Sequence, residues 1–372
     1  MNPGTLNDLR GALRILAGAR APLILVGAGA RCVTADLEVI ASGLGAAVMT
    51  TPDAVSVYDR TSRYAAGVCS FGACARARAI ARASDVVLAV GTNIGEFGGR
   101  GGAAFEQATV IQVTDDPADL CIRRPAAVSL VGELCAAMSQ LAAAVSANGP
   151  RKPWFEDLPR AAEAPARERA PGRGIDPKDA ILAIADALPA ESRIACDVTT
   201  AALLLLHDLP LRPKTSVWLQ IERSACMGMA LATGLGIRMA SGVPTLVLLG
   251  DWGLMMASAE LHTVATLGVG AFVIVAWANG GGLLIRNGVR RQGLEVPDDV
   301  HTWPTPNFAQ VAEGFGLHAA TARTASALRG AVADGMAASS PVLVHAVIDP
   351  EGPIPGAEDR YETLRAVSLS AT

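Results

Sequence analysis

Residues 246–286, LVLLGDWGLMMASAELHTVATLGVGAFVIVAWANGGGLLIR, contain two apolar runs, each followed directly by a polar residue. Asp251 follows the first run, Asn279 follows the second, and a helix is expected between them at residues 257–267. Short apolar runs bounded by Gly are typical of buried parallel strands. Parallel strands joined by a helix end at the same edge of their sheet, so we expect both polar side chains there. The stretch therefore predicts an α/β fold with a ligand site at the carboxyl edge of a sheet.

The composition of the whole chain favours the same fold class. Of its 372 residues, 51% are apolar and only 4% are aromatic, and 38 are Gly. Small aliphatic residues with many glycines are typical of layered α/β proteins with tight turns between strands and helices. The length is sufficient for two domains that each bury a core. We therefore predict an α/β protein with two doubly wound parallel-sheet domains.

Strand-like runs recur along both halves of the chain, with helical segments between them. In the first half they lie at residues 23–29, 46–51, 85–92 and 108–116. In the second half they lie at residues 192–198, 216–221, 245–250, 271–278 and 342–348. This alternation predicts two parallel sheets with helices on their faces.

Between the halves, residues 146–174 are rich in Pro, Ala, Arg and Glu and lack apolar periodicity. Such a segment is typical of an exposed linker between domains. We predict a Rossmann-like domain at residues 1–145, a linker at 146–174 and a second domain at 175–372.

Charge and cysteine content restrict the classes of partner and the compartment. The net charge is −4 and no long Lys/Arg run occurs, which argues against nucleic acid or an anionic membrane as partner and favours a small molecule. Seven Cys are scattered without a CxxC pair, and the first residues lack the layout of a signal peptide. These features predict a soluble cytoplasmic protein.

The residue types after the two strands indicate a metal site. The Asp251 carboxylate, the Asn279 amide oxygen and a backbone carbonyl of the turn NGGG are hard oxygen ligands suited to Mg²⁺ or Ca²⁺. Mg²⁺ often completes its coordination with phosphate oxygens, so the ligand is expected to be a phosphate ester. Each residue taken singly also suits a helix cap, and the pairing favours the metal.

At this point the sequence resembles a known family. GDWG at 250–253, followed by ANGGGLLIR at 278–286, is similar to the diphosphate-binding signature of thiamine-diphosphate-dependent enzymes, in the branch with acetolactate synthase and the 2-oxo acid decarboxylases. ACDVTT at 195–200 and SACMGMALATGLGIRMA at 224–240 resemble further segments of that family. Residues 22–120 resemble its central domain, and residues 306–351 its closing segment. The resemblance thus covers nearly the whole chain.

The resemblance implies thiamine diphosphate and Mg²⁺ as cofactors. It implies that Asp251, Asn279 and the Gly281 carbonyl bind the metal, that Met227 supports the bent cofactor, and that Gly228 begins a helix whose N–H groups lie near the diphosphate. A core Met is the alternative for Met227, and a helix cap the alternative for each Thr at 199 and 200. The full set of residues implied at the cofactor is Asp197, Thr199, Thr200, Cys226, Met227, Gly228, Gly250, Asp251, Trp252, Gly253, Asn279, Gly281, Gly282 and Leu283.

Family members also contain an aminopyrimidine-binding module that supplies a catalytic Glu, and this sequence resembles only the central and diphosphate-binding modules. The resemblance therefore implies a lyase or transferase acting on a 2-oxo acid, active only with a separate aminopyrimidine-module subunit. We expect a hetero-oligomer with two copies of each chain, the Glu coming from the partner. Which 2-oxo acid is used, and whether the product is an aldehyde or a ligated acid, stays open.

Three positions depart from the family pattern. Trp252 stands where the family has Gly, Ala278 stands for the first Asn, and the usual Pro of the Met227 segment is absent. A Trp at 252 either crowds the diphosphate or points into a subunit interface. Crowding leaves open a second hypothesis, a non-catalytic stabilising or regulatory partner of a related enzyme.

The first domain contains part of a dinucleotide fingerprint, VGAGARC at 26–32, without a clearly placed acidic residue after it. We expect this domain to hold no FAD or nucleotide. A nucleotide-binding protein is the third hypothesis.

Overall fold

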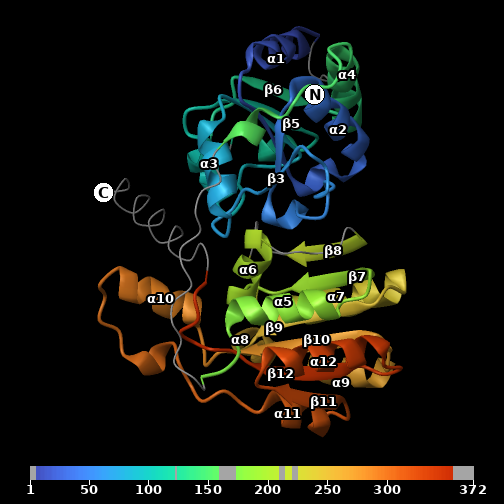
Figure 1. Ribbon diagram of the computed structural model, residues 1–372, viewed down its shortest axis with the longest axis vertical. Coiled ribbons are helices and arrows are strands. Elements are labelled where there is room, and N and C mark those ends of the chain that lie inside the picture. Colours follow the sequence, from blue (N-terminus) through green and yellow to red (C-terminus); the bar gives the residue numbers. More distant parts are fainter. Residues whose placement is uncertain (1–5, 122–123, 159–172, 209–213, 220–224, 355–372) are drawn as a thin grey trace. The chain divides into compact units, whose positions relative to one another are not determined.

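The computed structural model describes residues 6–121, 124–158, 173–208, 214–219 and 225–354 (Figure 1). The chain divides into two compact units, residues 1–164 and 165–372. Each unit contains one six-stranded sheet in which all neighbouring strands are parallel. The predicted α/β class with two doubly wound parallel sheets is therefore confirmed.

The sheet of the first unit has the strand order β3-β2-β1-β4-β5-β6, the order of a Rossmann fold. Its strands are β1 (Pro22–Val26), β2 (Ala47–Thr50), β3 (Ala65–Val68), β4 (Val86–Val90), β5 (Thr109–Thr114) and β6 (Val128–Val131). Its helices are α1 (Leu6–Gly18), α2 (Thr34–Leu44), α3 (Ala75–Ala83) and α4 (Leu134–Ser146), with 3-10 turns η1 (Ala28–Cys32), η2 (Pro52–Ala54), η3 (Arg100–Phe105), η4 (Pro117–Asp119) and η5 (Trp154–Asp157).

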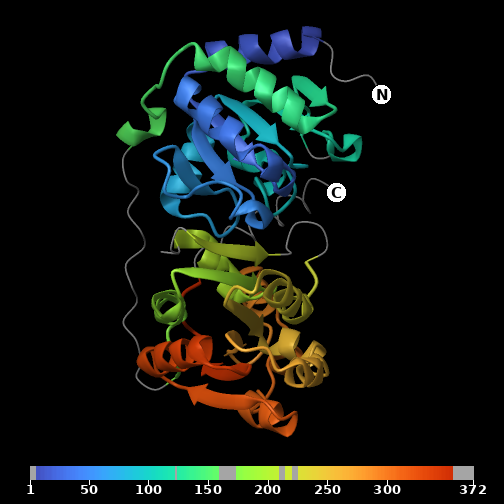
Figure 2. The same ribbon diagram turned by 90° about the vertical axis from the view of Figure 1, so that its right-hand side faces the viewer.

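Both faces of this sheet are covered, which is why its central strands are apolar throughout. Alternate residues of β1 enter two different clusters: Ile24 packs with α1, α2 and α4, and Leu25 packs with α3 and η5. Figure 2 shows α1, α2 and α4 together on one side of the sheet.

Part of the predicted linker belongs to this unit. Phe155 is buried in the cluster around α3, and the Trp154 indole N–H donates to the Pro22 carbonyl at 2.9 Å. The prediction of an exposed linker over all of 146–174 does not hold for η5, where Phe155 is buried and Trp154 is half-buried with its indole N–H bonded to the first unit. Residues 159–172 lie outside the described part of the chain.

The sheet of the second unit has the order β11-β12-β10-β9-β7-β8. Its strands are β7 (Glu191–Cys196), β8 (Lys214–Leu219), β9 (Thr245–Gly250), β10 (Phe272–Ala278), β11 (His318–Ala322) and β12 (Val342–Val347). Its helices are α5 (Pro177–Ala187), α6 (Thr200–Asp208), α7 (Met229–Ser241), α8 (Asp251–Met256), α9 (Glu260–Leu267), α10 (Leu283–Arg291), α11 (Phe308–Gly314) and α12 (Ala325–Ala337), with η6 (Asp298–Val300).

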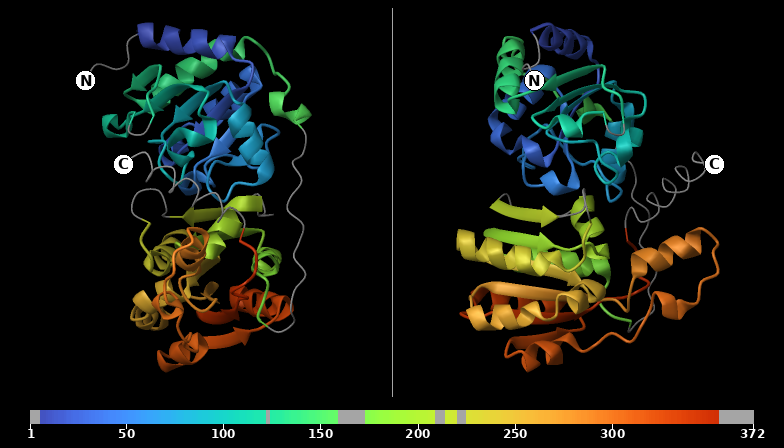
Figure 3. Two further views of the ribbon diagram at one scale, coloured as in Figure 1. Left: turned by 90° about the vertical axis from the view of Figure 1, so that its left-hand side faces the viewer. Right: turned by 180° about the vertical axis from the view of Figure 1, so that it is seen from behind.

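The helices of the second unit lie on both faces of its sheet. Leu231 of α7, Val264 of α9 and Phe308 of α11 share one buried cluster with Val247 and Ile274 of the central strands. Figure 1 shows α5 and α12 in front of the sheet, and the view from behind in Figure 3 shows α7 and α9. With both faces of the sheet covered by helices, a ligand is expected at the carboxyl ends of its strands.

Candidate functional site

Three consecutive strands of the second sheet end in polar residues. β7, β9 and β10 are neighbours, and they are followed by Asp197, Asp251 and Asn279. The strands are parallel, so all three residues lie at the carboxyl edge. The expectation that Asp251 and Asn279 follow neighbouring strands is confirmed.

Asp251 is the first residue of α8 and is buried. Its Oδ2 accepts hydrogen bonds from the backbone N–H groups of Asn279, Gly280 and Gly281 at 3.3, 2.9 and 3.0 Å. Gly280 and Gly281 have φ values of 87° and 132°, which a residue without Cβ adopts most readily. Burial raises the pKa of the Asp251 carboxyl, and the N–H donors at Gly281 and Gly280 oppose that shift. The loop thus surrounds a buried carboxylate with neutral donors.

The Asn279 side chain is oriented by its amide nitrogen. Nδ2 donates to the Thr200 hydroxyl oxygen at 3.2 Å, and the buried Trp277 indole N–H donates to the same oxygen at 3.1 Å. The Asn279 Oδ1 is buried and has no hydrogen-bond partner among the described residues. A buried amide oxygen without a partner is costly, so this atom is suited to receive a cation.

A second segment, residues 298–303, is bonded through its backbone to the loop that follows Asn279. Gly281 pairs with Thr302 in an antiparallel bridge, and the Gly282 N–H donates to the His301 carbonyl at 2.8 Å. The Gly281 carbonyl, predicted as a metal ligand, accepts from the Leu283 N–H at 3.0 Å. A carbonyl oxygen has two lone pairs, so this bond leaves one for a further ligand.

Asp197 approaches the start of α7. Its Oδ2 accepts the Gly228 N–H at 2.6 Å, and a Cβ on Gly253 would lie 2.1 Å from this oxygen. Burial raises the pKa of the Asp197 carboxyl, against the hydrogen bonds from Gly228 and the first residues of α7. The helix beginning at Gly228 was predicted to offer N–H groups near the diphosphate, and the Gly228 N–H itself donates to Asp197. Asp197 can occupy this place because Gly253 has no side chain.

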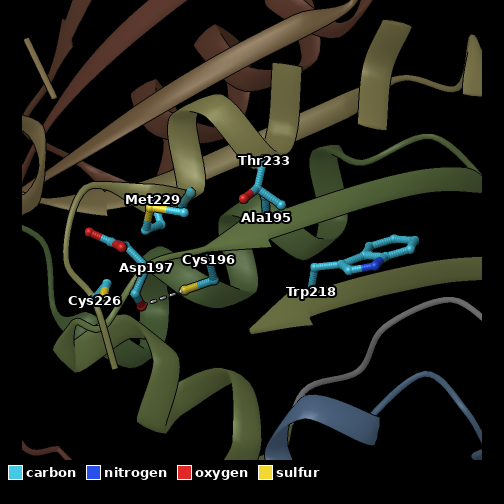
Figure 4. A pocket seen from close by; sticks show the side chains of 8 residues that line it. Ala195, Cys196, Asp197, Trp218, Cys226, Met229 and Thr233 are labelled. Atoms are coloured by element: carbon cyan, nitrogen blue, oxygen red, sulfur yellow. Dashed lines mark hydrogen bonds between the residues drawn. The ribbon is translucent and has the colours of Figure 1, made fainter. Parts of the chain in front are cut away.

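Asp197 also lines a small pocket at the start of α7, where Figure 4 shows it between Cys226 and Met229. Its Oδ1 is buried and has no hydrogen-bond partner among the described residues. The remaining lining residues are Ala195, Cys196, Trp218, Ala230 and Thr233.

The other predicted residues lie around the same edge in different settings. Met227 is 37% exposed, so the alternative of a core Met is wrong, and Cys226 is exposed beside it. Thr199 is buried, and its Oγ1 lies 3.1 Å from the position of a Cβ on Gly250. Thr200 was predicted at the diphosphate or as a cap, and its hydroxyl oxygen accepts from Asn279 and Trp277. Leu283 is buried at the start of α10.

Trp252 packs within its own chain. Its ring atoms lie 2.7 to 3.1 Å from where a Cβ on Gly282 would stand, and its ring centroid is 4.9 Å from that of Trp303. Sequence reasoning missed the role of residues 298–303, because only the folded loop brings them to residues 280–282. It also missed the use of Thr200 as an acceptor for Asn279.

Two family models match this chain over most of its length. Residues 9–141 match the thiamine pyrophosphate enzyme central domain, and residues 197–346 match the C-terminal TPP binding domain of the same family. The chain belongs to the thiamine pyrophosphate enzyme family. Within it, similar proteins are 2-oxo acid decarboxylases and acetolactate synthases.

Individual relatives are distant but cover most of the chain. Oxalyl-CoA decarboxylase of Escherichia coli is 25% identical over 91% of this chain and 60% of its own length. A probable 2-ketoarginine decarboxylase of Pseudomonas aeruginosa is 28% identical over 83% of this chain and 54% of its own length. A probable chloroplastic acetolactate synthase 2 of rice is 25% identical over 93% of this chain and 55% of its own length. The chain thus spans a little over half the length of these relatives.

A solved structure shows the same fold. The thiamine diphosphate-dependent 4-hydroxybenzoylformate decarboxylase of Rhodococcus jostii superposes with a TM-score of 0.73 at 21% sequence identity, over 94% of this chain and 65% of that one.

In the described part of the chain, none of the helices has the length and apolar character that a membrane span needs.

The residues of the edge fit a divalent metal. Asn279 Oδ1 is a buried oxygen without a hydrogen-bond partner among the described residues, and the buried Asp251 carboxylate accepts hydrogen bonds from neutral backbone N–H groups. A divalent cation would satisfy the first and neutralise the second. The edge therefore offers oxygen atoms suited to a divalent cation.

Proposed function

We propose that this chain supplies the metal- and diphosphate-binding half of a thiamine-diphosphate- and Mg²⁺-dependent 2-oxo acid decarboxylase or carboligase. The observation that carries the proposal is that buried Asp251, at the start of α8, is bonded to the loop of residues 279–281, in which Asn279 Oδ1 is buried without a described hydrogen-bond partner. In this role Asp251 and Asn279 would hold the metal. Thiamine diphosphate, when bound, would supply a nucleophilic carbon for chemistry at the carbonyl of a 2-oxo acid.

The chain's own residues orient this assembly. Thr200 fixes the Asn279 amide so that the amide oxygen is left for the metal. Asp251 holds the N–H groups of residues 279–281 on its Oδ2, which sets the curvature of the loop. Family membership supports thiamine diphosphate as the cofactor, and the oxygen donor set supports Mg²⁺.

We propose further that a separate polypeptide completes the site with an aminopyrimidine-binding module and its Glu, in an assembly with two copies of each chain. An exposed group of methionines supports a protein partner at this edge. Met227, Met229, Met255 and Met256 are 37%, 44%, 44% and 63% exposed, and Gly228 lies beside Met256. Neighbouring exposed apolar side chains are typical of protein interfaces, and Met adapts well to a partner surface.

The function is tested by titrating Mg²⁺ and thiamine diphosphate into the chain co-purified with an aminopyrimidine-module subunit, followed by assays of 2-oxo acid consumption. Saturable cofactor binding that requires Mg²⁺, with turnover, is expected. Absence of cofactor binding by the assembled complex would refute the enzymatic proposal and favour a second candidate, a non-catalytic partner. The observation behind that candidate is Trp252, which covers Gly282 next to the proposed metal loop.

A further inference from the structure

Trp252 and Gly282 are fitted to one another. A Cβ on Gly282 would lie 2.7, 2.9 and 3.1 Å from three carbon atoms of the Trp252 ring, so either the ring or the backbone at 282 would have to move. Gly282 has φ −79° and ψ 65°, a backbone conformation open to residues with side chains. The backbone conformation therefore does not require Gly at 282. It is the Trp252 ring that leaves no room for a side chain there.

A second aromatic ring, that of Trp303, also lies close to the Trp252 ring. Trp303 lies at a centroid distance of 4.9 Å with an interplanar angle of 38°, and its backbone N–H donates to the Gly280 carbonyl at 3.4 Å. The two residues before it bind the loop as well: Thr302 pairs with Gly281, and the His301 carbonyl accepts the Gly282 N–H. Residues 280–282 are thus held by backbone bonds from 301–303 and by the ring of Trp252.

We propose that Trp252 is a positioning residue of the metal loop. It occupies the side-chain space of Gly282, packs on Trp303, and so fixes the loop that presents Asn279 Oδ1 and the Gly281 carbonyl. The inference rests on the proposed function, because it assigns this loop to the metal. On this view the Trp assists cofactor binding, and Gly282 is its matched counterpart.

The fit is tested by a double-mutant cycle of W252G, G282A and W252G/G282A. The probe is Mg²⁺ with thiamine diphosphate, titrated by calorimetry into the chain with its partner subunit, and thermal melting of each variant is recorded in parallel. We expect W252G and G282A each to weaken cofactor affinity by roughly tenfold, and the double variant to bind clearly more tightly than the product of the two losses predicts. Coupling arises because the added methyl group enters the space that the ring has left.

Affinity separates positioning from a purely structural role. W252G is expected to lose affinity in buffer well below its melting temperature, where the protein is folded. G236A, in which the new methyl group meets nothing within 4 Å, is the matched control for a Gly-to-Ala change in the same unit and keeps wild-type affinity. Where W252G does not fold, W252F and W252F/G282A replace it, since the smaller ring also frees space at Gly282.

The outcomes distinguish this inference from the function on which it rests. If the wild-type complex binds no thiamine diphosphate, the proposed function fails. If the wild type binds and W252G or W252F binds equally well, or the losses at 252 and 282 are additive, the positioning role of Trp252 is refuted and the function stands.

Discussion

Replacing Asp251 by Asn and by Ala separates the two roles of this carboxylate. Its Oδ2 accepts three backbone N–H groups, and the bonds from Asn279 and Gly281 are buried. Asn keeps an acceptor oxygen at this place and removes the charge. Ala removes both.

The structure sets the size of each effect. Leaving two buried N–H groups without an acceptor costs about 1–3 kcal/mol each, so Asp251→Ala is expected to lose about 2–6 kcal/mol of stability. For a unit of this size that corresponds to a melting temperature lower by about 4–24 °C. Asp251→Asn is expected to stay within about 1 kcal/mol of wild type, because the bonds persist and the desolvated charge is gone.

Stability is expected to differ between the Asn and Ala variants, whereas metal binding is expected to be weakened in both. Both variants lack the carboxylate, so both are expected to lose Mg²⁺-dependent cofactor affinity by about 100-fold or more. The assays are thermal melting without metal and calorimetric titration of Mg²⁺ with thiamine diphosphate into the chain with its partner. An Asp251→Asn protein that melts like wild type and binds the cofactor normally would show that Asp251 only shapes the loop, and the metal assignment would be wrong.

Three further predictions follow from the contacts of the edge. Burial raises the pKa of Asp197 above its unfolded value of about 3.9, so its proton stabilises the folded state below that pH, and this contribution is lost as pH rises through the folded pKa. In urea titrations, the free energy of unfolding should therefore decline less over this pH window in Asp197→Asn than in wild type. Equal declines would contradict the assignment. Thr200→Val leaves the Asn279 amide N–H and the Trp277 indole N–H without their acceptor, which should cost about 2–6 kcal/mol in urea unfolding and weaken Mg²⁺-dependent cofactor binding. Thr200→Ser should restore both, and a Val variant with wild-type affinity would argue against the orienting role. Gly253→Ala places a methyl group 2.1 Å from the Asp197 oxygen and should lower the melting temperature. The decrease should be much smaller when Asp197 is also replaced by Ala. Equal decreases with and without Asp197 would show that the strain lies elsewhere.

The sequence predicted the central strands of both sheets because strands covered on both faces are apolar throughout. The strands it missed, β3, β6 and β11, all lie at sheet edges, where partial exposure removes the apolar run that marks a strand. It also assigned η5 to a linker, since two aromatic residues among Pro and charged residues show no periodicity.

For the site, the sequence by itself determined which residues follow β9 and β10. Spacing along the chain fixes strand ends, and parallel crossovers bring those ends to one edge, so Asp251 and Asn279 were placed together without coordinates. The tertiary structure alone decided what each side chain does there: that Asp197 takes the Gly228 N–H, that Thr200 orients Asn279, and that Trp252 lies against Gly282. These contacts join residues distant in sequence through distances of a few ångströms, and no local pattern encodes such distances.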